Sequence, residues 1–560
     1  MLSALLLLLG LTLASTWPHG DLRPPTMVGG DDFLLGQRMY REGILPSGTP
    51  MRASVKGDAP KVGMMFRCVS CHLRSGMGAV EGAIVARPIN GPRLYEPLYR
   101  IARTPLRRKP RRPESSPEPD LVRPAYSDAT LARALRDGID PSGRPLDAAM
   151  PRYRLDERDM EILIGYLKSL SAETSPGVTD TTIRFATVVT EGVEPAERDA
   201  MLATLEAHLE DRNAEPRRQV ERDDVSLKPM YAGYAGARRL ELSRWDLRGP
   251  SNTWRGQLDA LNRARPVFGL LGGMAAGDWR PIHEFCEEQE IPCLLPITEL
   301  PKVSETDWHT LYFSKGVYQE GEAAARYLRS MPGIPPELPV IQVLRDTPEG
   351  RALSTGFEEV WRTSGRPQPK RKVLGPEEPL TPADLETVAG VGGVALVWLG
   401  SADVAALWRR MAAATPGPRM VFVSSGLLGE ALHSIPEQAR SRTYITYQGP
   451  LPEEHGRRMA AVESWSRSRG IPWTRPAVQS RAYFIGWILS AALARMKDNF
   501  YRDYLLDVMD MMIDQTYAIA PYERVSFGPG QRYASKGCYI VQLGPGPRPD
   551  LLKRSDWVVH

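Results

Sequence analysis

The chain has 560 residues, which at roughly 100–200 residues per domain is too long for one compact core. Hydrophobic residues make up 42% and charged residues 25%, and 71 basic against 67 acidic side chains leave a net charge of only +4. This balance is typical of a soluble multidomain protein and excludes bulk electrostatic binding of nucleic acid. Five cysteines are too few for a disulfide-held scaffold, so their positions carry more information than their number.

The N-terminus is an apolar stretch over residues 1–14 that is too short to span a bilayer comfortably. Small and polar residues follow it, as in a cleavable secretory signal, with Ala14 the candidate last residue before the cut. We therefore expect a signal peptide at 1–20, a periplasmic location, and no membrane span in the mature chain. The segment lacks the Lys or Arg that usually opens such a signal, and an uncleaved membrane anchor stays open as the alternative.

A short amphipathic segment at 33–40 and a Gly/Pro/Ser-rich stretch lead to the string Cys68-Val-Ser-Cys71-His72. This spacing lets both sulfurs add to the vinyl groups of one haem and places the imidazole under the iron. A Cys₂His zinc site is one alternative, but no second ligand pair lies nearby. A thioredoxin-like redox pair is another, but it would need a βαβ context, and the flanks are rich in Gly and Arg. We predict one covalent haem c on Cys68 and Cys71, with His72 as axial ligand.

Around this motif, residues 31–172 resemble the class I cytochrome c family. In that family a first helix carrying Gly and an aromatic crosses the last helix. Gly36 and Tyr40 match the first helix, and a helical pattern at 156–170, with Leu163, Tyr166 and Leu167, matches the last one. The resemblance implies an all-α cytochrome c domain.

The family also has a Gly-Pro-x-Leu turn after the haem motif, present here as Gly91-Pro92-Arg93-Leu94. The resemblance implies that the Pro92 carbonyl accepts the second ring N–H of His72, which would orient the imidazole. A plain turn proline is the alternative.

The family's sixth iron ligand is a Met in the loop before the last helix, and Met150 stands there, six residues ahead of Asp156. The rivals are Met64 and Met65, which precede the motif and fit packing, and Met77, only five residues past His72. Ligation by His72 and Met150 would raise the reduction potential and fill both axial positions. Such a haem suits electron transfer and leaves no open position for substrate chemistry.

Residues 100–124 form a biased insert with seven Arg or Lys side chains up to Arg112, followed by Pro and Glu. We expect a solvated loop, with docking of an acidic partner as the alternative. Residues 173–180 have the composition of a linker.

From about residue 180 onward, short apolar runs alternate with longer amphipathic stretches. The predicted strands are 183–190, 239–242, 267–271, 293–297, 340–344, 394–399, 420–424 and 442–446. The predicted helices are 197–209, 254–263, 279–289, 319–331, 351–362 and 402–414. This alternation predicts parallel α/β sheets, and the length of this part favours two lobes over one sheet.

Residues 181–545 resemble the type 1 periplasmic solute-binding proteins of the branched-chain amino acid-binding group. The resemblance rests on the order of several short strings: Leu270-Leu-Gly272-Gly273, Gln319-Glu-Gly321 and Asp346-Thr-Pro-Glu-Gly350. Such proteins close two lobes around a solute at the carboxyl ends of strands near a hinge.

The resemblance implies a solute site in the loops after the strands, at Gly273, Thr298, Ser401 and Ser424. It does not favour an α-amino acid, because the loop at 272–276 carries no hydroxyl and no aromatic ring stands near Thr347. A different small solute, a peptide, or no ligand at all stay open.

Three cysteines lie outside the haem motif. Cys286 and Cys293 flank a six-residue turn, and both a disulfide and two buried thiols stay open. Cys538 fits a buried strand residue. The histidines beyond the motif are scattered, and no nucleophile–base arrangement predicts a hydrolase.

The sequence therefore predicts an all-α cytochrome c domain followed by a two-lobed α/β periplasmic-binding-protein-like domain. The main functional expectation is single-electron transfer in the periplasm, with the second domain sensing a solute or docking a dehydrogenase or oxidase. The alternative is the solute-binding receptor of an ABC-type uptake system with an accessory cytochrome. A third is a non-catalytic subunit of a dehydrogenase complex. We expect no nucleic-acid partner and no enzymatic activity.

Overall fold

The computed structural model describes residues 30–55, 61–62, 66–82, 84–100, 120–222, 238–413, 417–512, 521–522, 525–547 and 549–559. The expected signal peptide at 1–20, most of the insert at 100–124, and Met64 and Met65 lie outside these residues. The chain divides into two compact units, Met1–Ala172 and Glu173–His560.

Five helices lie in the described part of the N-terminal unit. They are α1 (Gly30–Glu42), α2 (Val69–His72), α3 (Gly91–Tyr95), α4 (Asp128–Asp137) and α5 (Glu157–Ser169). Ser127 caps α4 through the Thr130 amide, and Asp156 caps α5 through the Asp159 amide, so both helices begin where a polar side chain satisfies an end amide.

The unit also contains short antiparallel strands, so the all-α expectation is wrong in this respect. Its strands are β1 (Arg52–Ser54), β2 (Lys61–Val62), β3 (Val80–Glu81), β4 (Ile84–Val85), β5 (Leu98–Arg100), β6 (Asp120–Arg123) and β7 (Arg152–Tyr153). They form a sheet in the order β2-β1-β7 and two separate pairs, β3-β4 and β5-β6. Extended loop segments that run antiparallel satisfy their backbone groups in this way. The basic insert is the connection between β5 and β6.

The crossing of α1 and α5 organises the core of this unit, as the family resemblance implied. A Cβ on Gly36 would lie 2.5 Å from the Cβ of Tyr166, so only glycine allows the two helices to approach this closely. The rings of Tyr40 and Tyr166 lie 5.4 Å apart, and Leu163 and Leu167 are buried beside them.

The first lobe of the C-terminal unit is built on a parallel sheet in the order β12-β11-β10-β8-β9. Its strands are β8 (Thr182–Thr190), β9 (Arg239–Leu247), β10 (Gly269–Leu271), β11 (Cys293–Leu294) and β12 (Thr310–Leu311). One face packs on α8 (Trp254–Ala264) and α9 (Arg280–Glu288), and the other packs on α6 (Pro195–Arg222) and helices from the end of the chain.

The second lobe is built on a larger sheet in the order β14-β13-β15-β16-β17-β18-β19. Its parallel strands are β13 (Val340–Arg345), β14 (Lys370–Leu374), β15 (Val394–Trp398), β16 (Met420–Ser424) and β17 (Thr443–Tyr447). Antiparallel strands β18 (Gly537–Leu543), β19 (Leu551–Lys553) and β20 (Val558–Val559) close one edge.

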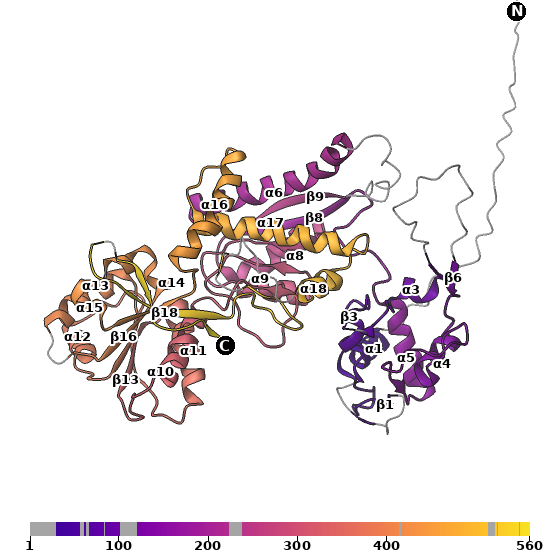
Figure 1. The fold of residues 1–560 in the computed structure, drawn as a ribbon, viewed down its shortest axis with the longest axis horizontal. Helices are drawn as coiled ribbons and strands as arrows, with labels where there is room; N and C mark the ends of the chain where they lie inside the picture. The colour runs from indigo at the N-terminus through magenta and orange to yellow at the C-terminus, as the bar shows by residue number, and fades with distance from the viewer. Residues whose placement is uncertain are drawn as a thin grey trace, which may run out of the picture. The chain divides into compact units, whose positions relative to one another are not determined.

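Helices cover both faces of this second sheet. One face carries α10 (Val317–Ser330) and α11 (Pro348–Arg362). The other carries α12 (Pro382–Ala389), α13 (Ser401–Ala413), α14 (Ser425–Leu428) and α15 (Glu437–Arg440). The two-lobed α/β expectation is confirmed by this topology (Figure 1).

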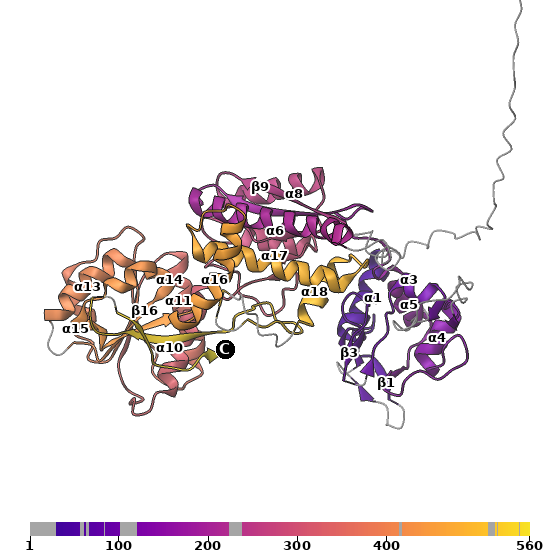
Figure 2. The ribbon, with the colours of Figure 1, turned by 45° about the horizontal axis from the view of Figure 1, so that its top comes forward.

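After β17 the chain returns to the first lobe. The returning helices are α16 (Pro452–Ser468), α17 (Pro476–Met496) and α18 (Arg502–Asp510). Figures 1 and 2 both show α17, drawn in orange, beside the early helix α6, and the two helices are in contact. The sequence analysis missed α17, because its buried residues lie on nearly every side and show no amphipathic period.

All eight predicted strands and six predicted helices of this unit overlap an observed element. The missed strand β14 has charged residues and lies at a sheet edge, so no apolar run marks it. The expected linker at 173–180 is bound to the first lobe, since the Ser175 amide donates to the Phe500 carbonyl at 3.4 Å. The sheet also continues past the predicted end at 545, through β19 and β20.

Among the described residues, no helix is both long and apolar enough to cross a bilayer.

Candidate functional site

The Cys-x-x-Cys-His string folds into one helical turn. The amides of Cys71 and His72 donate to the Cys68 carbonyl at 3.2 and 2.9 Å. A helical turn brings positions three apart to the same side, so both sulfurs could bond to one neighbouring group. Both cysteines are thiols, Cys68 buried and Cys71 exposed. Burial raises the pKa of Cys68 to about 11, and the Tyr153 hydroxyl lies 3.9 Å from its sulfur.

His72 is buried, and its ring is oriented by a backbone carbonyl. Nδ1 lies 2.9 Å from the Arg87 carbonyl oxygen, so Nδ1 carries the hydrogen and Nε2 holds the lone pair. Burial lowers the pKa of His72, which favours the neutral ring. The carbonyl expected in this role was that of Pro92, and the structure places Arg87 there instead.

The Arg87 carbonyl lies next to the His72 ring because of the hairpin formed by β3 and β4. The Gly78 amide donates to the His72 carbonyl at 3.0 Å, and the Ala86 amide donates to the Ala79 carbonyl at 2.9 Å. The hairpin therefore returns the chain to the motif at Arg87, whereas Pro92 lies in the first turn of α3.

Met150 is half-buried and packs against the core cluster that contains Cys68. Met77 is 9% exposed, and its amide donates to the Ser75 hydroxyl at 3.2 Å. Two thiols on one turn, a neutral imidazole and a thioether are the groups that a covalent haem needs, so the residues present fit this cofactor. In the described part of the chain, no cluster of three or more His, Cys, Asp or Glu is arranged to hold a metal ion.

In the C-terminal unit, the chain crosses between the lobes after β12, after β17 and before β18. The first and third crossovers pair, because the Tyr312 amide donates to the Arg532 carbonyl at 2.8 Å. The second is tied to the first by Gln448, whose Nε2 donates to the Gly316 carbonyl at 2.9 Å. These bonds align the crossovers as one hinge.

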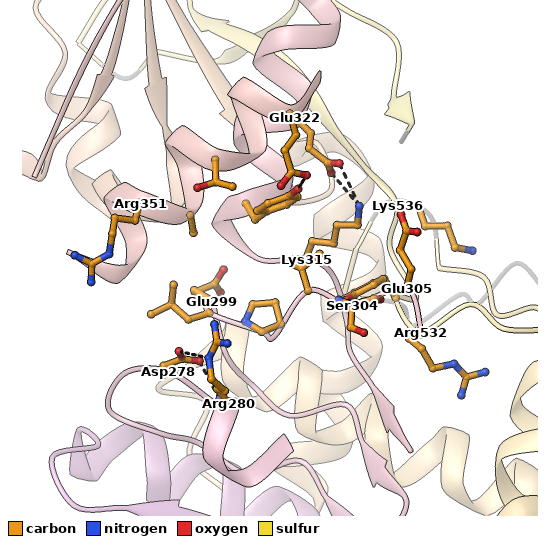
Figure 3. Close-up of a pocket in the computed structure, with 18 of the residues that line it drawn as sticks. Asp278, Arg280, Glu299, Ser304, Glu305, Lys315, Glu322, Arg351, Arg532 and Lys536 are labelled. Carbon is orange, nitrogen blue, oxygen red and sulfur yellow. Dashed lines mark hydrogen bonds and ion pairs between the residues drawn. The ribbon is translucent and has the colours of Figure 1, made fainter. Parts of the chain in front are cut away.

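A cavity of about 1090 Å³ lies beside this hinge, with walls from both lobes (Figure 3). Helices α10 and α11 supply one wall through Tyr318, Glu322, Arg326, Arg351, Thr355 and Glu359. Loops of the first lobe and the third crossover supply the other through Asp278, Arg280, Glu299, Glu305, Arg532 and Lys536.

Ion pairs and hydrogen bonds hold many of the charged side chains in this cavity. Lys315 Nζ lies 3.1 Å from a Glu322 carboxylate oxygen, and the two point at each other in Figure 3. The Tyr318 hydroxyl donates to Glu359, and burial raises the pKa of Tyr318, so it stays a donor. The lining is therefore polar and of mixed charge, which suits a polar solute.

The four residues that the resemblance suggested for a solute site do not line this cavity. Gly273 is buried against Trp279, and the Thr298 hydroxyl accepts the Leu300 amide at 3.0 Å. Ser401 is exposed at the start of α13. Ser424 is buried and caps α14 by accepting the Leu427 amide at 3.1 Å. The residue after Thr298, Glu299, does reach the cavity wall.

A buried carboxylate beside the hinge was missed. Glu320 of α10 is 1% exposed and accepts the Thr446 hydroxyl at 2.6 Å and the Gly426 amide at 3.0 Å. Burial raises its pKa to about 7. In the sequence, an acidic residue between Gln319 and Gly321 looks like any helical surface charge, so no local signal marks it.

Of the two alternatives left open for Cys286 and Cys293, the structure has two buried thiols. Cys538 is buried within β18, as expected.

No protein-family model matches the chain, and no curated protein matches it. The chain is similar to several solved structures, at low sequence identity. One is a branched-chain amino acid ABC transporter protein from Thermus thermophilus with bound valine, at 12% identity, with 68% of this chain and 97% of that chain covered and a TM-score of 0.47. Another is a type 1 periplasmic binding protein from Bordetella pertussis, at 13% identity, 66% and 100% coverage and a TM-score of 0.47. A third is a fatty acid ABC transporter substrate-binding protein from Thermomonospora curvata, at 13% identity, 69% and 95% coverage and a TM-score of 0.45.

Proposed function

We propose that the C-terminal unit binds a small polar solute between its two lobes. The observation that carries this proposal is the cavity of about 1090 Å³ beside the hinge, with charged side chains from both lobes on its walls. Rotation about the aligned crossovers would bring α10 and α11 toward the loops of the first lobe and enclose the solute. The sequence resemblance to type 1 periplasmic solute-binding proteins supports the same function.

A thermal-shift screen tests this function on the full chain. Polar solutes of both charge signs are added one at a time, and a bound solute raises the melting temperature of the C-terminal unit by mass action. A variant that disturbs the hinge replaces Gly316 by proline at the first crossover. The φ of Gly316 is 57°, which lies outside the range that proline adopts. This variant should lose the solute-induced shift if closure is required. Failure of every solute would reject the proposal.

A second function is favoured by the N-terminal unit. We propose that Cys68 and Cys71 hold one haem c covalently, with His72 and Met150 as axial ligands. The observation behind it is the single helical turn with two thiols, followed by an imidazole whose Nδ1 is bonded to the Arg87 carbonyl. A bound haem would supply one-electron redox chemistry. The chain's own part is to fix the imidazole tautomer through Arg87 and to exclude water with the core around Cys68.

Haem attachment is tested by expressing the chain together with haem-attachment machinery. The wild type should retain haem on a denaturing gel and give a reduced-minus-oxidised difference spectrum. The double variant Cys68→Ala/Cys71→Ala should lose both signals, whereas Cys538→Ala, a buried cysteine of the other unit, should keep them. Haem that leaves the wild type on denaturation would reject covalent attachment.

We place this protein in the periplasm, as the receptor of an ABC-type uptake system whose accessory cytochrome exchanges electrons with a dehydrogenase or oxidase. The apolar segment at 1–14 supports export. Fractionation tests the location: the full chain should enter the periplasmic fraction, and a variant without residues 1–20 should stay with the cytoplasm.

A further inference from the structure

Arg326 differs from the other cations of the cavity because its guanidinium has no hydrogen-bond or ion-pair partner within the part of the chain that the structure describes. It lies on α10 one turn after Glu322 and lines the cavity wall. Its side chain is half-buried, and its Nε is buried without a hydrogen-bond partner. Within the described residues, no ion pair or hydrogen bond of its guanidinium is found. An unsatisfied buried N–H costs free energy, and a bound ligand that accepts from it would recover that cost.

The remaining cations of this cavity are all engaged by the protein. Lys315 pairs with Glu322 at 3.1 Å, Arg280 with Asp278 at 3.4 Å, and Arg351 with Asp346 at 2.5 Å. Arg532 forms an ion pair with Asp510, and Lys536 donates hydrogen bonds to Ser526 and Gln531.

The acids on the same wall are also engaged. Glu322 accepts from Lys315, and Glu359 accepts the Tyr318 hydroxyl. Glu305, a lining carboxylate on the opposite wall, is exposed and lies beside Ser304 in Figure 3. On the wall formed by α10 and α11, Arg326 is therefore the cation whose guanidinium has no ion-pair or hydrogen-bond partner among the described residues.

We infer that the solute of this cavity carries a carboxylate group and that Arg326 binds it. The inference rests on the proposed solute-binding function and names the chemistry that the site selects. A guanidinium offers a planar fork of donors that matches the two oxygens of a carboxylate, and such charge-assisted pairs are among the stronger hydrogen bonds in proteins. The anion would sit on the face of α10 and α11, away from the strand-end loops of Gly273 and Ser424.

The test is isothermal titration calorimetry on the full, haem-loaded chain with matched probes. Acetate, succinate and benzoate supply carboxylates; acetamide, succinamide and benzamide are their neutral counterparts; inorganic phosphate and putrescine supply a different anion and a cation. We expect a carboxylate to bind at least about tenfold more tightly than its amide, a difference of about 1.4 kcal/mol. Putrescine should bind weakly or not at all.

Arg326→Gln should lower the affinity for the bound carboxylate by about tenfold or more, since it removes the charge. Arg326→Lys should recover part of the lost affinity, because lysine keeps the positive charge but lacks the planar pair of guanidinium donors. The matched control is Arg329→Gln on the same helix, which removes an equal charge from a residue that contacts Thr363 and does not line the cavity. This control should keep the wild-type affinity.

Arg326→Met provides a readout that needs no solute. Replacing an unpartnered cation by an apolar chain should leave the melting temperature of the unliganded protein unchanged or raise it, as is common for residues kept for binding. A fall in melting temperature together with unchanged carboxylate affinity would assign Arg326 a structural role and overturn the inference.

The remaining outcomes separate the two proposals. Binding of phosphate in preference to every carboxylate, or tight binding of putrescine or an amide that Arg326→Gln does not weaken, would overturn the inference and keep the solute-binding function. Absence of binding by every probe would reject the solute-binding function and the inference with it.

Discussion

Burial changes the pKa of single side chains in the C-terminal unit. Glu320 is the clearest case, because its carboxylate is removed from water and surrounded by donors from Gly426, Thr446 and Gln448. These hydrogen bonds favour the charged form, but burial outweighs them and raises the pKa to about 7. The protonated form is therefore favoured in the folded state relative to the unfolded chain.

This shift predicts how stability changes with pH. Because the folded-state pKa is raised, the stabilisation from Glu320 is fully present below pH about 4.5 and is lost as the pH rises through about 7. A rise from 4.5 to about 7 corresponds to on the order of 3 kcal/mol. Urea unfolding at pH 4.5, 6 and 8 should show wild type losing stability relative to Glu320→Gln.

The control for this prediction is Glu206→Gln, which changes an exposed carboxylate on α6. It should follow the pH dependence of the wild type. A stability difference between wild type and Glu320→Gln that stays the same from pH 4.5 to pH 8 would contradict the assignment.

Met150 is tested by the potential of the haem-loaded protein. Met150→Ala should lower the reduction potential by on the order of 100 mV, a fraction of the roughly 0.8 V over which axial ligands set haem potentials. Met77→Ala removes a buried Met near the same motif and should leave the potential close to that of the wild type. The reverse pattern would make Met77 the sixth ligand.

At the scale of elements, close helix packing at one glycine supports the N-terminal unit. The crossing of α1 and α5 was expected from the resemblance to the class I cytochrome c family, which Gly36 and Tyr40 carry in the first helix. The position of the His72 partner was not predictable in this way, since it depends on the hairpin of β3 and β4, whose strands have two residues each.

Gly36→Ala tests this crossing. Its Cβ would meet the Cβ of Tyr166 at 2.5 Å and the Ile162 carbonyl at 2.9 Å, so the helices must separate. We expect a loss of about 1–3 kcal/mol from overpacking, seen as a melting temperature lower by several degrees for the N-terminal unit. Gly30→Ala in the same helix has open space around its Cβ and should cause no such loss. Equal melting temperatures for both variants would argue against tight packing at Gly36.

At the scale of the whole molecule, each unit has a core of its own. The N-terminal core comprises residues between Met39 and Leu170, and the cores of the C-terminal unit comprise residues between Ile183 and Trp557. A unit with a separate hydrophobic core can unfold as a separate cooperative transition.

Scanning calorimetry of the haem-loaded chain should therefore show two transitions. Cys68→Ala/Cys71→Ala should lower only one of them, because a cofactor stabilises the unit that holds it. A bound solute should raise only the other. A single transition that shifts under both changes would contradict independent folding of the units.

Local spacing by itself was enough to predict haem attachment at Cys68, Cys71 and His72 and to locate eight strands of the α/β lobes, because these predictions depend on residues close together in the chain. Only the tertiary structure decided where the cavity beside the hinge lies. Its walls join α10, α11, the loop around Glu299 and the crossover at Arg532, which are far apart in sequence. It also decided which cations have a partner: the sequence does not distinguish Lys315 from Arg326, and only the folded chain pairs the first with Glu322 and leaves the second without a hydrogen-bond partner for its Nε. Pairing depends on distance and burial, which sequence order does not specify.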